Sequence, residues 1–316
     1  MASWRDGGMA GERGGAIARW REERRYFLII IITSLIVIAG QYLSQRAISQ
    51  TSGKSIVMPS PALDWNSTPQ KHFIGIFTDA KSYARRALIR MGYLHIYPKP
   101  WVNLELYFVI CEKPTSPMMS KLLKLEQFTH RDLLLLDCTE NMDEGKTHTY
   151  FSYMGSGKGP QGFNYATVMK LDTDAIIHLP RYIERIEGLP KKSIYYGLPQ
   201  IGFEDYVYMG GYAYTLSMDL CIWIAQSEFA ANNTIGFEDR KLATWLLHYN
   251  ATSNPGELNM VGESESRMWT EFPDPLVNVP PDIIVLHRAK SDEKFITGSF
   301  LMLGQVLNPG LADDLL

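Results

Sequence analysis

The chain contains 316 residues with the apolar and charged content of an ordinary globular protein, and its formal net charge is -3. A mildly negative balance argues against a general nucleic-acid-binding protein, since such proteins carry clustered positive charge. The length suits one large domain with shorter flanking segments. The motifs along the chain must therefore indicate what the domain does.

An apolar segment near the N-terminus, 26–43, carries no charged residue and approaches the shortest length that spans a bilayer as a helix. The arginines around it are concentrated on its N-terminal side: Arg19, Arg21, Arg24 and Arg25. This bias predicts that residues 1–25 form a cytoplasmic tail and 26–43 a transmembrane signal-anchor. A cleaved signal peptide is the alternative, but its apolar region would be shorter and a small-residue cleavage site would follow.

Glycosylation sequons at Asn66, Asn232 and Asn250 agree with a lumenal location for the rest of the chain. The lumen permits disulfides, and the chain has three cysteines, so at most one intrachain pair can form. Cys111 and Cys138 each end an apolar run and are candidates for such a pair. Three buried free thiols are the alternative.

Residues 44–70 are polar and Pro-containing and lack apolar periodicity, which predicts a stem between the membrane and a folded domain at 71–316. The domain opens with a predicted strand at 72–80 and a predicted helix at 81–94. Arg86 and Arg90 lie four residues apart and share a face of that helix. We expect these side chains either to contact phosphates or to form a solvated basic face.

The next segments continue the alternation of strand and helix. Strands are expected at 104–113 and 132–141, with a helix at 115–130 between them and a helix at 142–154 after them. The unbroken apolar run in the strand at 132–141 is typical of a strand that is covered on both faces. The sequence therefore predicts an α/β fold with a mainly parallel sheet.

A further apolar run ends in Asp172-Thr173-Asp174, and a second apolar run follows it. Burying unpaired carboxylates is costly, so a cation should offset them. Mg2+ and Mn2+ prefer carboxylate and phosphate oxygens, and ligands of open α/β sheets bind at the carboxyl ends of the strands. The pattern predicts a site for a divalent metal and a diphosphate. An ordinary turn at a strand end is the alternative, because Asp favours turns.

Three later features add candidate site residues. Gly210-Gly211, between aromatic residues, indicates either a close approach of a ligand to the backbone or a β-bulge. Glu238 and Asp239 begin a predicted helix at 236–248, where they either complement the helix dipole or provide a general base. His287 ends a predicted strand at 282–288 and is a candidate metal ligand, although a lone histidine is more often structural.

These segments, in this order, resemble the family-31 glycosyltransferases, which include the Golgi β-1,3-galactosyltransferases, and they are closest to plant members of that family. The similarity covers about 72–290. "FIGIFTDAKSYARRALIR" resembles the family's opening strand and R-R-x-x-I-R helix, and "DLLLLDCTENMDEGKTHTYF" resembles its N-L-T-x-K-T segment. "VMKLDTDAII" resembles its K-x-D-D-D motif. "YMGGYAYTLSMDL" resembles its G-x-x-Y-x-x-S-x-D segment, and "GFEDRKLATWL" resembles its E-D-V segment.

The resemblance implies a GT-A-type fold with a mixed, mainly parallel sheet, a UDP-sugar donor, and Mn2+ or Mg2+ as cofactor. It implies inverting transfer to a hydroxyl of a glycan or glycoprotein acceptor. Asp174 matches the main metal ligand, His287 would complete the metal site, and Asp239 matches the catalytic base. Asp172 matches the first Asp of the motif and would lie near the ribose or sugar of the donor. Lys170, Arg86 and Arg90 are the other residues that we expect to bind the donor.

The expected activity is a β-1,3-galactosyltransferase, anchored in the Golgi membrane as a single-pass type II protein with a lumenal catalytic domain. Thr173 replaces the middle Asp of the family motif, and Met91-Gly92-Tyr93 replaces a T-W pair. These departures leave two alternatives open: an N-acetylglucosaminyl- or other hexosyltransferase, and a non-catalytic membrane-anchored glycan-binding protein. The formation of a homodimer is also left open.

Overall fold

The computed structural model describes residues 71–94, 103–113, 116–162, 164–202, 206–272 and 279–307. The predicted tail, signal-anchor and stem lie outside these residues, as does Asn66. Within the described part of the chain, no helix combines the length and the apolar character needed to cross a membrane.

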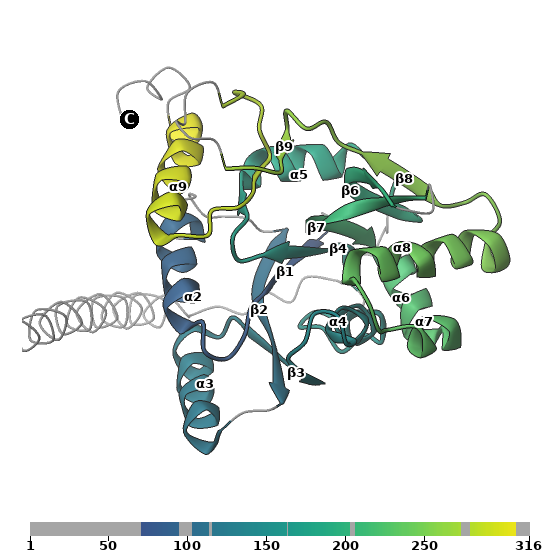
Figure 1. The fold of residues 1–316 in the computed structure, drawn as a ribbon, viewed down its shortest axis with the longest axis horizontal. Coiled ribbons are helices and arrows are strands. Elements are labelled where there is room, and N and C mark those ends of the chain that lie inside the picture. Colours follow the sequence, from purple (N-terminus) through teal and green to yellow (C-terminus); the bar gives the residue numbers. More distant parts are fainter. Residues whose placement is uncertain are drawn as a thin grey trace, which may run out of the picture. The chain divides into compact units, whose positions relative to one another are not determined.

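A seven-stranded sheet forms the centre of the domain (Figure 1). Its strands are, in spatial order, β3 (Leu133–Thr139), β2 (Leu104–Lys113), β1 (Lys71–Phe77), β4 (Tyr165–Asp172), β7 (Val207–Ser217), β6 (Ile194–Ile201) and β8 (Asn259–Gly262). Neighbouring strands run parallel except where β7 pairs with β4 and with β6. The prediction of a mixed, mainly parallel sheet is confirmed.

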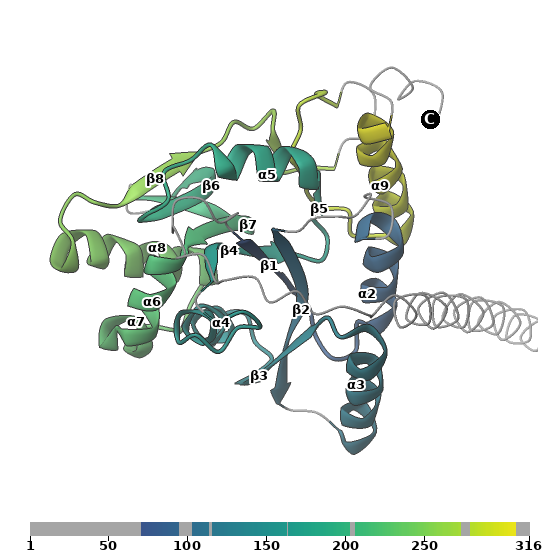
Figure 2. The ribbon, with the colours of Figure 1, turned by 180° about the vertical axis from the view of Figure 1, so that it is seen from behind.

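Helices cover both faces of this sheet (Figures 1 and 2). Four of them pack on one face: α2 (Tyr83–Ile89), α3 (Pro117–His130), α5 (Leu179–Glu187) and α9 (Asp292–Leu307). Four others pack on the opposite face: α4 (Lys146–Gly155), α6 (Met218–Gln226), α7 (Glu228–Asn232) and α8 (Glu238–His248). In β1, Ile74 and Ile76 enter the first core and Phe73 and Phe77 the second, because side chains alternate along a strand.

Two helices differ from the sequence-based expectation. The predicted helix at 142–154 begins only at Lys146, because Gly145 has a φ of 94° and cannot be part of the helix. The predicted helix at 81–94 ends its α-helical part at Ile89 and continues as the π-helix η1 (Arg90–Leu94). The first difference shortens a helix, whereas the second changes the type of helix from Arg90 to Leu94.

A small second sheet brings distant parts of the chain together. It contains β5 (Ile176–Ile177), β10 (Val285–Leu286) and β9 (Met268–Trp269). The predicted strand at 282–288 is thus reduced to two residues. Leu286 pairs with Ile176 in antiparallel register, so the residues after β10 lie beside the residues before β5.

The buried His72 at the start of β1 should make the stability of the domain sensitive to acid. Its Nδ1 lies 2.8 Å from Thr167 Oγ1, and its Nε2 has no hydrogen-bond partner among the described residues. Burial lowers the pKa of His72 to about 4 from an ordinary 6.5. Folding therefore favours the neutral form of His72. The free energy of unfolding should be highest above pH 6.5 and should fall by up to about 3 kcal/mol as the pH is lowered toward 4.

Urea unfolding at pH 7 and at pH 4.5 tests this expectation. A His72→Gln variant should lose less stability on acidification than the wild-type protein does. His130→Gln, at an exposed position, is the matched control and should keep the wild-type dependence. An equal acid response of His72→Gln and wild type would show that His72 does not cause the effect.

Candidate active site

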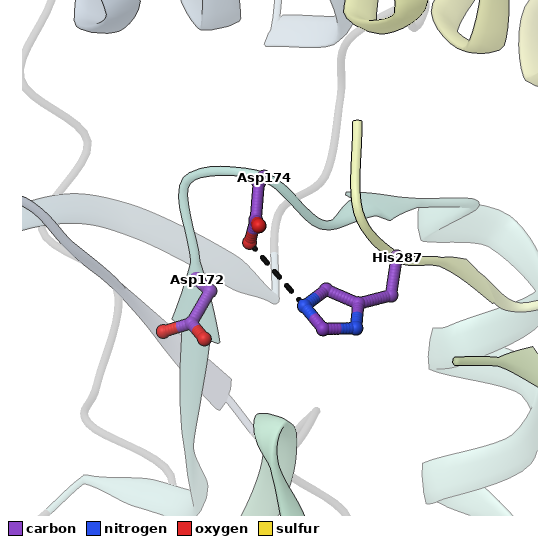
Figure 3. A group of neighbouring side chains, drawn as sticks. All are labelled: Asp172, Asp174 and His287. Carbon is purple, nitrogen blue, oxygen red and sulfur yellow. Dashed lines mark ion pairs between the residues drawn. The ribbon is translucent and has the colours of Figure 1, made fainter. Parts of the chain in front are cut away.

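Two carboxylates and an imidazole meet at the carboxyl end of β4 (Figure 3). Asp172 ends β4, Asp174 lies in the turn before β5, and His287 follows β10. One ligand atom from each of the three side chains lies within 4.8 Å of the others, and Asp174 Oδ1 is 3.4 Å from His287 Nε2. The antiparallel pairing of β5 with β10 creates this proximity, and Ala289 N donates to Asp174 O at 2.9 Å.

The orientation of the His287 ring is fixed by its surroundings. Its Nδ1 lies 3.1 Å from the carbonyl oxygen of Thr270, which can only accept, so Nδ1 carries a hydrogen. The ring stacks on Tyr212 with centroids 4.3 Å apart, and Tyr212 Oη donates to Met268 O at 3.0 Å. His287 Nε2 is thereby presented to Asp174, and a lone pair that faces a carboxylate requires a proton or a cation between the two groups.

The donor set of this acidic cluster (Asp172, Asp174 and His287) fits a divalent cation such as Mn2+, which accepts carboxylate oxygen and imidazole nitrogen. Burial by itself would raise the pKa of Asp174, but the hydrogen bond and charge of His287, with the charge of Lys290, hold it below its ordinary value. Asp174 is therefore ionised at neutral pH, as a metal ligand must be. The structure brings the three residues together, and their roles in binding a metal and a donor stay predictions.

Lys170 is buried between two carboxylates, a different setting from the donor contact predicted for it. Its Nζ lies 2.7 Å from Asp172 Oδ1 and 2.9 Å from Glu238 Oε1, and it also donates to the carbonyl oxygen of Gly211. These partners occupy the three donors of the ammonium group. Burial alone would lower the pKa of Lys170, but Asp172 and Glu238 outweigh burial and raise it. Lys170 thus connects the acidic cluster to the start of α8.

The two carboxylates that begin α8 have different environments. Glu238 is buried, and its Oε2 accepts from Tyr214 Oη at 2.6 Å and from Thr147 Oγ1 at 3.3 Å. Asp239 is only half-buried, and its oxygens accept from Gly211 N at 3.2 Å and from Arg240 N at 2.8 Å. Burial raises the pKa of Asp239 above its ordinary value. Of this pair, Asp239 is the more exposed residue.

The carboxylates of α8 occupy the space that a side chain at position 211 would need, so this position requires glycine. A Cβ at Gly211 would lie 2.8 Å from Glu238 Oε1 and 3.1 Å from Asp239 Oδ2. The pairing of β6 with β7 shifts register between Gly197 and Pro199, opposite this part of β7. This break in the pairing agrees with the interpretation as a β-bulge, and the groups that approach the backbone of Gly211 are carboxylates of the same chain.

Arg86 and Arg90 neither form a solvated basic face nor are free to contact phosphates, the two roles that the sequence suggested. Neither side chain is solvated: Arg86 is fully buried and Arg90 is 6% exposed. Arg86 Nε and Nη2 bind Glu126 at 2.8 and 2.7 Å, and Arg90 Nε and Nη2 bind Asp132 at 2.7 and 2.8 Å. These bidentate pairs tie α2 and η1 to α3 and to the start of β3, so the phosphate-binding role and the solvated basic face are both wrong.

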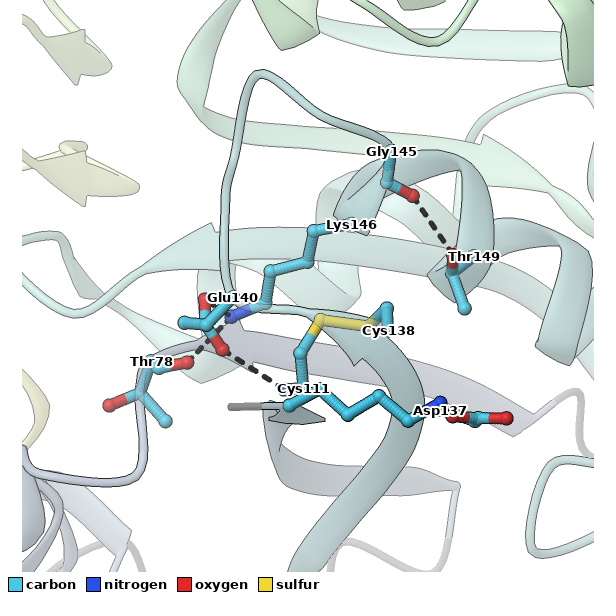
Figure 4. The surroundings of a disulfide bond; sticks show 9 residues. Thr78, Cys111, Asp137, Cys138, Glu140, Gly145, Lys146 and Thr149 are labelled. Atoms are coloured by element: carbon cyan, nitrogen blue, oxygen red, sulfur yellow. Dashed lines mark hydrogen bonds and ion pairs between the residues drawn. A yellow bond between two sulfur atoms is a disulfide. The ribbon is translucent and has the colours of Figure 1, made fainter. Parts of the chain in front are cut away.

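A second polar group, which the sequence did not predict as a site, joins the carboxyl ends of β1, β2 and β3 (Figure 4). Lys146 is buried, donates to Thr78 O at 2.6 Å, and forms an ion pair with Glu140. Glu140 Oε2 accepts from Cys111 N at 3.0 Å. The Thr78 hydroxyl is buried and has no hydrogen-bond partner among the described residues. A buried unpaired hydroxyl at a strand end is a candidate contact for a ligand.

A disulfide between Cys111 and Cys138 closes the same edge of the sheet (Figure 4). The pairing of β2 with β3 places Cys111 opposite Leu136, two residues before Cys138. The candidate pair is confirmed, the alternative of three free thiols is wrong, and Cys221 remains buried and free.

The described sequon residues differ in exposure. Asn232 is exposed at the end of α7, whereas Asn250 is half-buried in the π-helix η2 (Tyr249–Ser253) and its Oδ1 accepts from Leu258 N at 3.0 Å. The attachment of glycans at these positions stays a prediction.

No family model matches the chain. Over 228 residues the chain is 25% identical to the β-1,3-galactosyltransferase pvg3 of Schizosaccharomyces pombe, a match that covers 55% of this chain and 59% of that protein. The chain thus spans less than two thirds of the length of this relative. The similarity supports the expectation of a glycosyltransferase.

Two solved structures show more distant similarity. The galactosyltransferase LgtC, in complex with donor and acceptor sugar analogues, is 11% identical with a TM-score of 0.41, and the match covers 73% of this chain and 95% of LgtC. The mannosyltransferase PcManGT from Pyrobaculum calidifontis, in complex with GDP-Man and Mn2+, is 15% identical with a TM-score of 0.40, and the match covers 75% of this chain and 65% of that protein.

Proposed function

We propose that the chain is an inverting, metal-dependent galactosyltransferase with a GT-A-type fold. It transfers galactose from UDP-galactose to a hydroxyl of a glycan or glycoprotein and forms a β-1,3 linkage. The observation that carries this proposal is the acidic cluster at the end of β4, joined through Lys170 to Glu238 at the start of α8, where the neighbouring Asp239 is half-buried. The resemblance of the motifs and the similarity to the yeast galactosyltransferase support it.

The nucleotide-sugar donor is proposed to lie at the carboxyl ends of β1 and β4, where open α/β sheets bind their ligands. Phe77 of β1 pairs with Asp172 of β4, so Thr78 follows β1 at the same edge as the acidic cluster. The unpaired Thr78 hydroxyl offers a hydrogen bond to the donor. A divalent cation held by Asp172, Asp174 and His287 would offset the negative charge that develops on UDP as it leaves.

Asp239 is proposed as the general base of the reaction. It removes the proton from the acceptor hydroxyl as the hydroxyl oxygen attacks the anomeric carbon of galactose. UDP leaves from the opposite face of the sugar, so the anomeric configuration inverts. Burial raises the pKa of Asp239, which makes it a stronger base than an exposed aspartate.

The proposed location is the Golgi membrane, with single-pass type II topology and a lumenal catalytic domain. The apolar segment 26–43 and the sequons support this assignment. The disulfide between Cys111 and Cys138 also agrees with it, since disulfides persist in oxidising compartments.

Another hexose, such as N-acetylglucosamine, is the alternative donor sugar, because Thr173 replaces the family's middle Asp. Release of UDP from a panel of UDP-sugars, measured with one acceptor, distinguishes the donors. A non-catalytic glycan-binding protein would show no metal-dependent affinity for UDP and no turnover with any donor.

Calorimetric titration of UDP into the purified protein tests the proposed function. With Mn2+ present we expect binding that a chelator abolishes. Asp174→Ala should weaken this binding by about a hundredfold or more and abolish transfer, because loss of a direct ligand exceeds the effect of losing a supporting residue. Asp292→Ala, at an exposed carboxylate outside the cluster, is the matched control and should bind as the wild type does. Unchanged UDP binding and transfer in Asp174→Ala would contradict the proposed metal site.

A further inference from the structure

An exposed aromatic side chain lies two residues before the proposed base. Phe237 is the N-cap residue of α8, two residues before Asp239, and it is 63% exposed. A single exposed aromatic residue needs no explanation by itself. Phe237 is distinguished by the way in which its ring and its backbone are held.

The ring of Phe237 is stacked with a guanidinium group. The Cζ atom of Arg240 lies 4.9 Å from the centroid of the Phe237 ring and 5.6 Å from that of Tyr208 in β7. Such cation–π contacts fix the relative orientation of the three side chains. One face of the Phe237 ring is covered by Arg240 and the ring stays largely exposed, so its other face is directed to solvent.

The backbone that carries Phe237 is held to neighbouring elements. Ile235 forms an antiparallel bridge with Glu144, and Gly236 N donates to Asp143 O at 2.9 Å. The segment before α8 is therefore fixed against the loop that precedes α4. A ligand that stacks on Phe237 has little backbone to order, which favours binding.

We propose that Phe237, supported by Arg240 and Tyr208, is the acceptor subsite and that it stacks against the pyranose ring of the acceptor sugar. This inference rests on the proposed transferase function. A pyranose presents one largely apolar C–H face, which packs on an aromatic ring, and hydroxyls around its edge. Only Glu238 separates Phe237 from Asp239, so their Cα atoms lie within about 7 Å of each other, and a hexopyranose on the ring would lie near the base.

The test measures how UDP release depends on a simple acceptor. The full chain is purified in detergent and supplied with Mn2+ and UDP-galactose, and the methyl glycosides of galactose, glucose, mannose and N-acetylglucosamine are titrated. The variants are Phe237→Ala, Phe237→Trp and Ile235→Ala. Ile235 is 74% exposed in the same segment and serves as the matched control.

We expect at least one methyl glycoside to accelerate UDP release by the wild type. Phe237→Ala should raise its half-saturating concentration by about tenfold, the effect of losing one aromatic contact. The affinity for UDP should be unchanged, which also shows that the variant is folded. Phe237→Trp should restore the half-saturating concentration, and Ile235→Ala should match the wild type.

Three results would overturn proposals, and they are distinguishable. If Phe237→Ala has the same half-saturating concentration of the methyl glycoside as the wild type, the proposed subsite is wrong but the proposed function stands. A wild type that binds UDP with Mn2+ but responds to no methyl glycoside also overturns the subsite, because a hexopyranose is then not its ligand. A wild type that neither binds UDP nor turns over any donor overturns the proposed function, and the subsite with it.

Discussion

Replacing Asp239 with asparagine should reduce transfer by about a thousandfold, within the range that general-base catalysis contributes, while UDP binding is retained. The amide has nearly the size of the carboxylate but cannot accept the proton of the acceptor hydroxyl. One amide oxygen can still accept from Gly211 N or Arg240 N, so the start of α8 should keep its position. The defect is therefore expected in kcat rather than in donor affinity.

Steady-state kinetics with calorimetric titration of UDP would check this result. Asp219→Asn is the matched control, because Asp219 likewise accepts a backbone N–H, from Ser193, but at the start of α6 and outside the site. In the wild type, kcat/KM should fall as the pH is lowered through the raised pKa of Asp239, since the base acts only when ionised. An Asp239→Asn enzyme with more than about a tenth of the wild-type kcat would exclude Asp239 as the base.

The acidic cluster could be predicted because its signals are local. Apolar runs that end in Asp172 and Asp174 indicate a buried strand with carboxylates at its end, and strand ends meet at one edge of a sheet. The apolar run that ends in His287 gives the same signal, although the strand there has only two residues. The register of β5 with β10, which brings His287 to Asp174, has no signal in such short segments.

The partners of the buried cations depend on tertiary structure. The spacing of Arg86 and Arg90 places them on one face of a helix but does not say what that face meets. Their carboxylate partner Glu126 lies 40 residues from Arg86 in the sequence. Lys170 is an intermediate case. It lies two residues before Asp172 in a strand and therefore shares a face with that carboxylate, so its ion pair with Asp172 is predictable from the sequence. Its other partner, Glu238, is 68 residues away, and the sequence does not indicate that pair.

Removing the charge of Lys170 should have the largest effect on stability. Lys170 is 1% exposed, lies between Asp172 and Glu238, and has the rings of Phe77 and Tyr214 within 5.5 and 5.6 Å of its Nζ. Lys170→Met keeps an unbranched apolar side chain but leaves Glu238 as a buried carboxylate without a cation. Loss of one partner of a buried pair costs about 3–5 kcal/mol, so we expect the free energy of unfolding to fall by that amount.

The pH dependence of this loss should identify Glu238 as its cause. Burial already raises the pKa of Glu238 in the wild type, and loss of Lys170 should raise it further. When the pKa of Glu238 is higher in the folded protein than in the unfolded chain, the protein keeps its stability at pH values below the pKa of the unfolded chain. It loses stability as the pH rises through the pKa of the folded protein. The deficit of Lys170→Met should therefore be small in acid and large at neutral pH.

Urea unfolding of Lys170→Met, Glu238→Gln and the double variant would separate the pair from its individual partners. The double variant should be more stable than Lys170→Met at neutral pH, because a neutral amide replaces the uncompensated carboxylate. Lys113→Met is the matched control: Lys113 forms an exposed ion pair with Asp137, and its loss should hardly change stability. If Lys170→Met behaved like Lys113→Met, the buried ion pair would not hold the acidic cluster to α8, and Asp172 and Asp239 would have to be positioned independently.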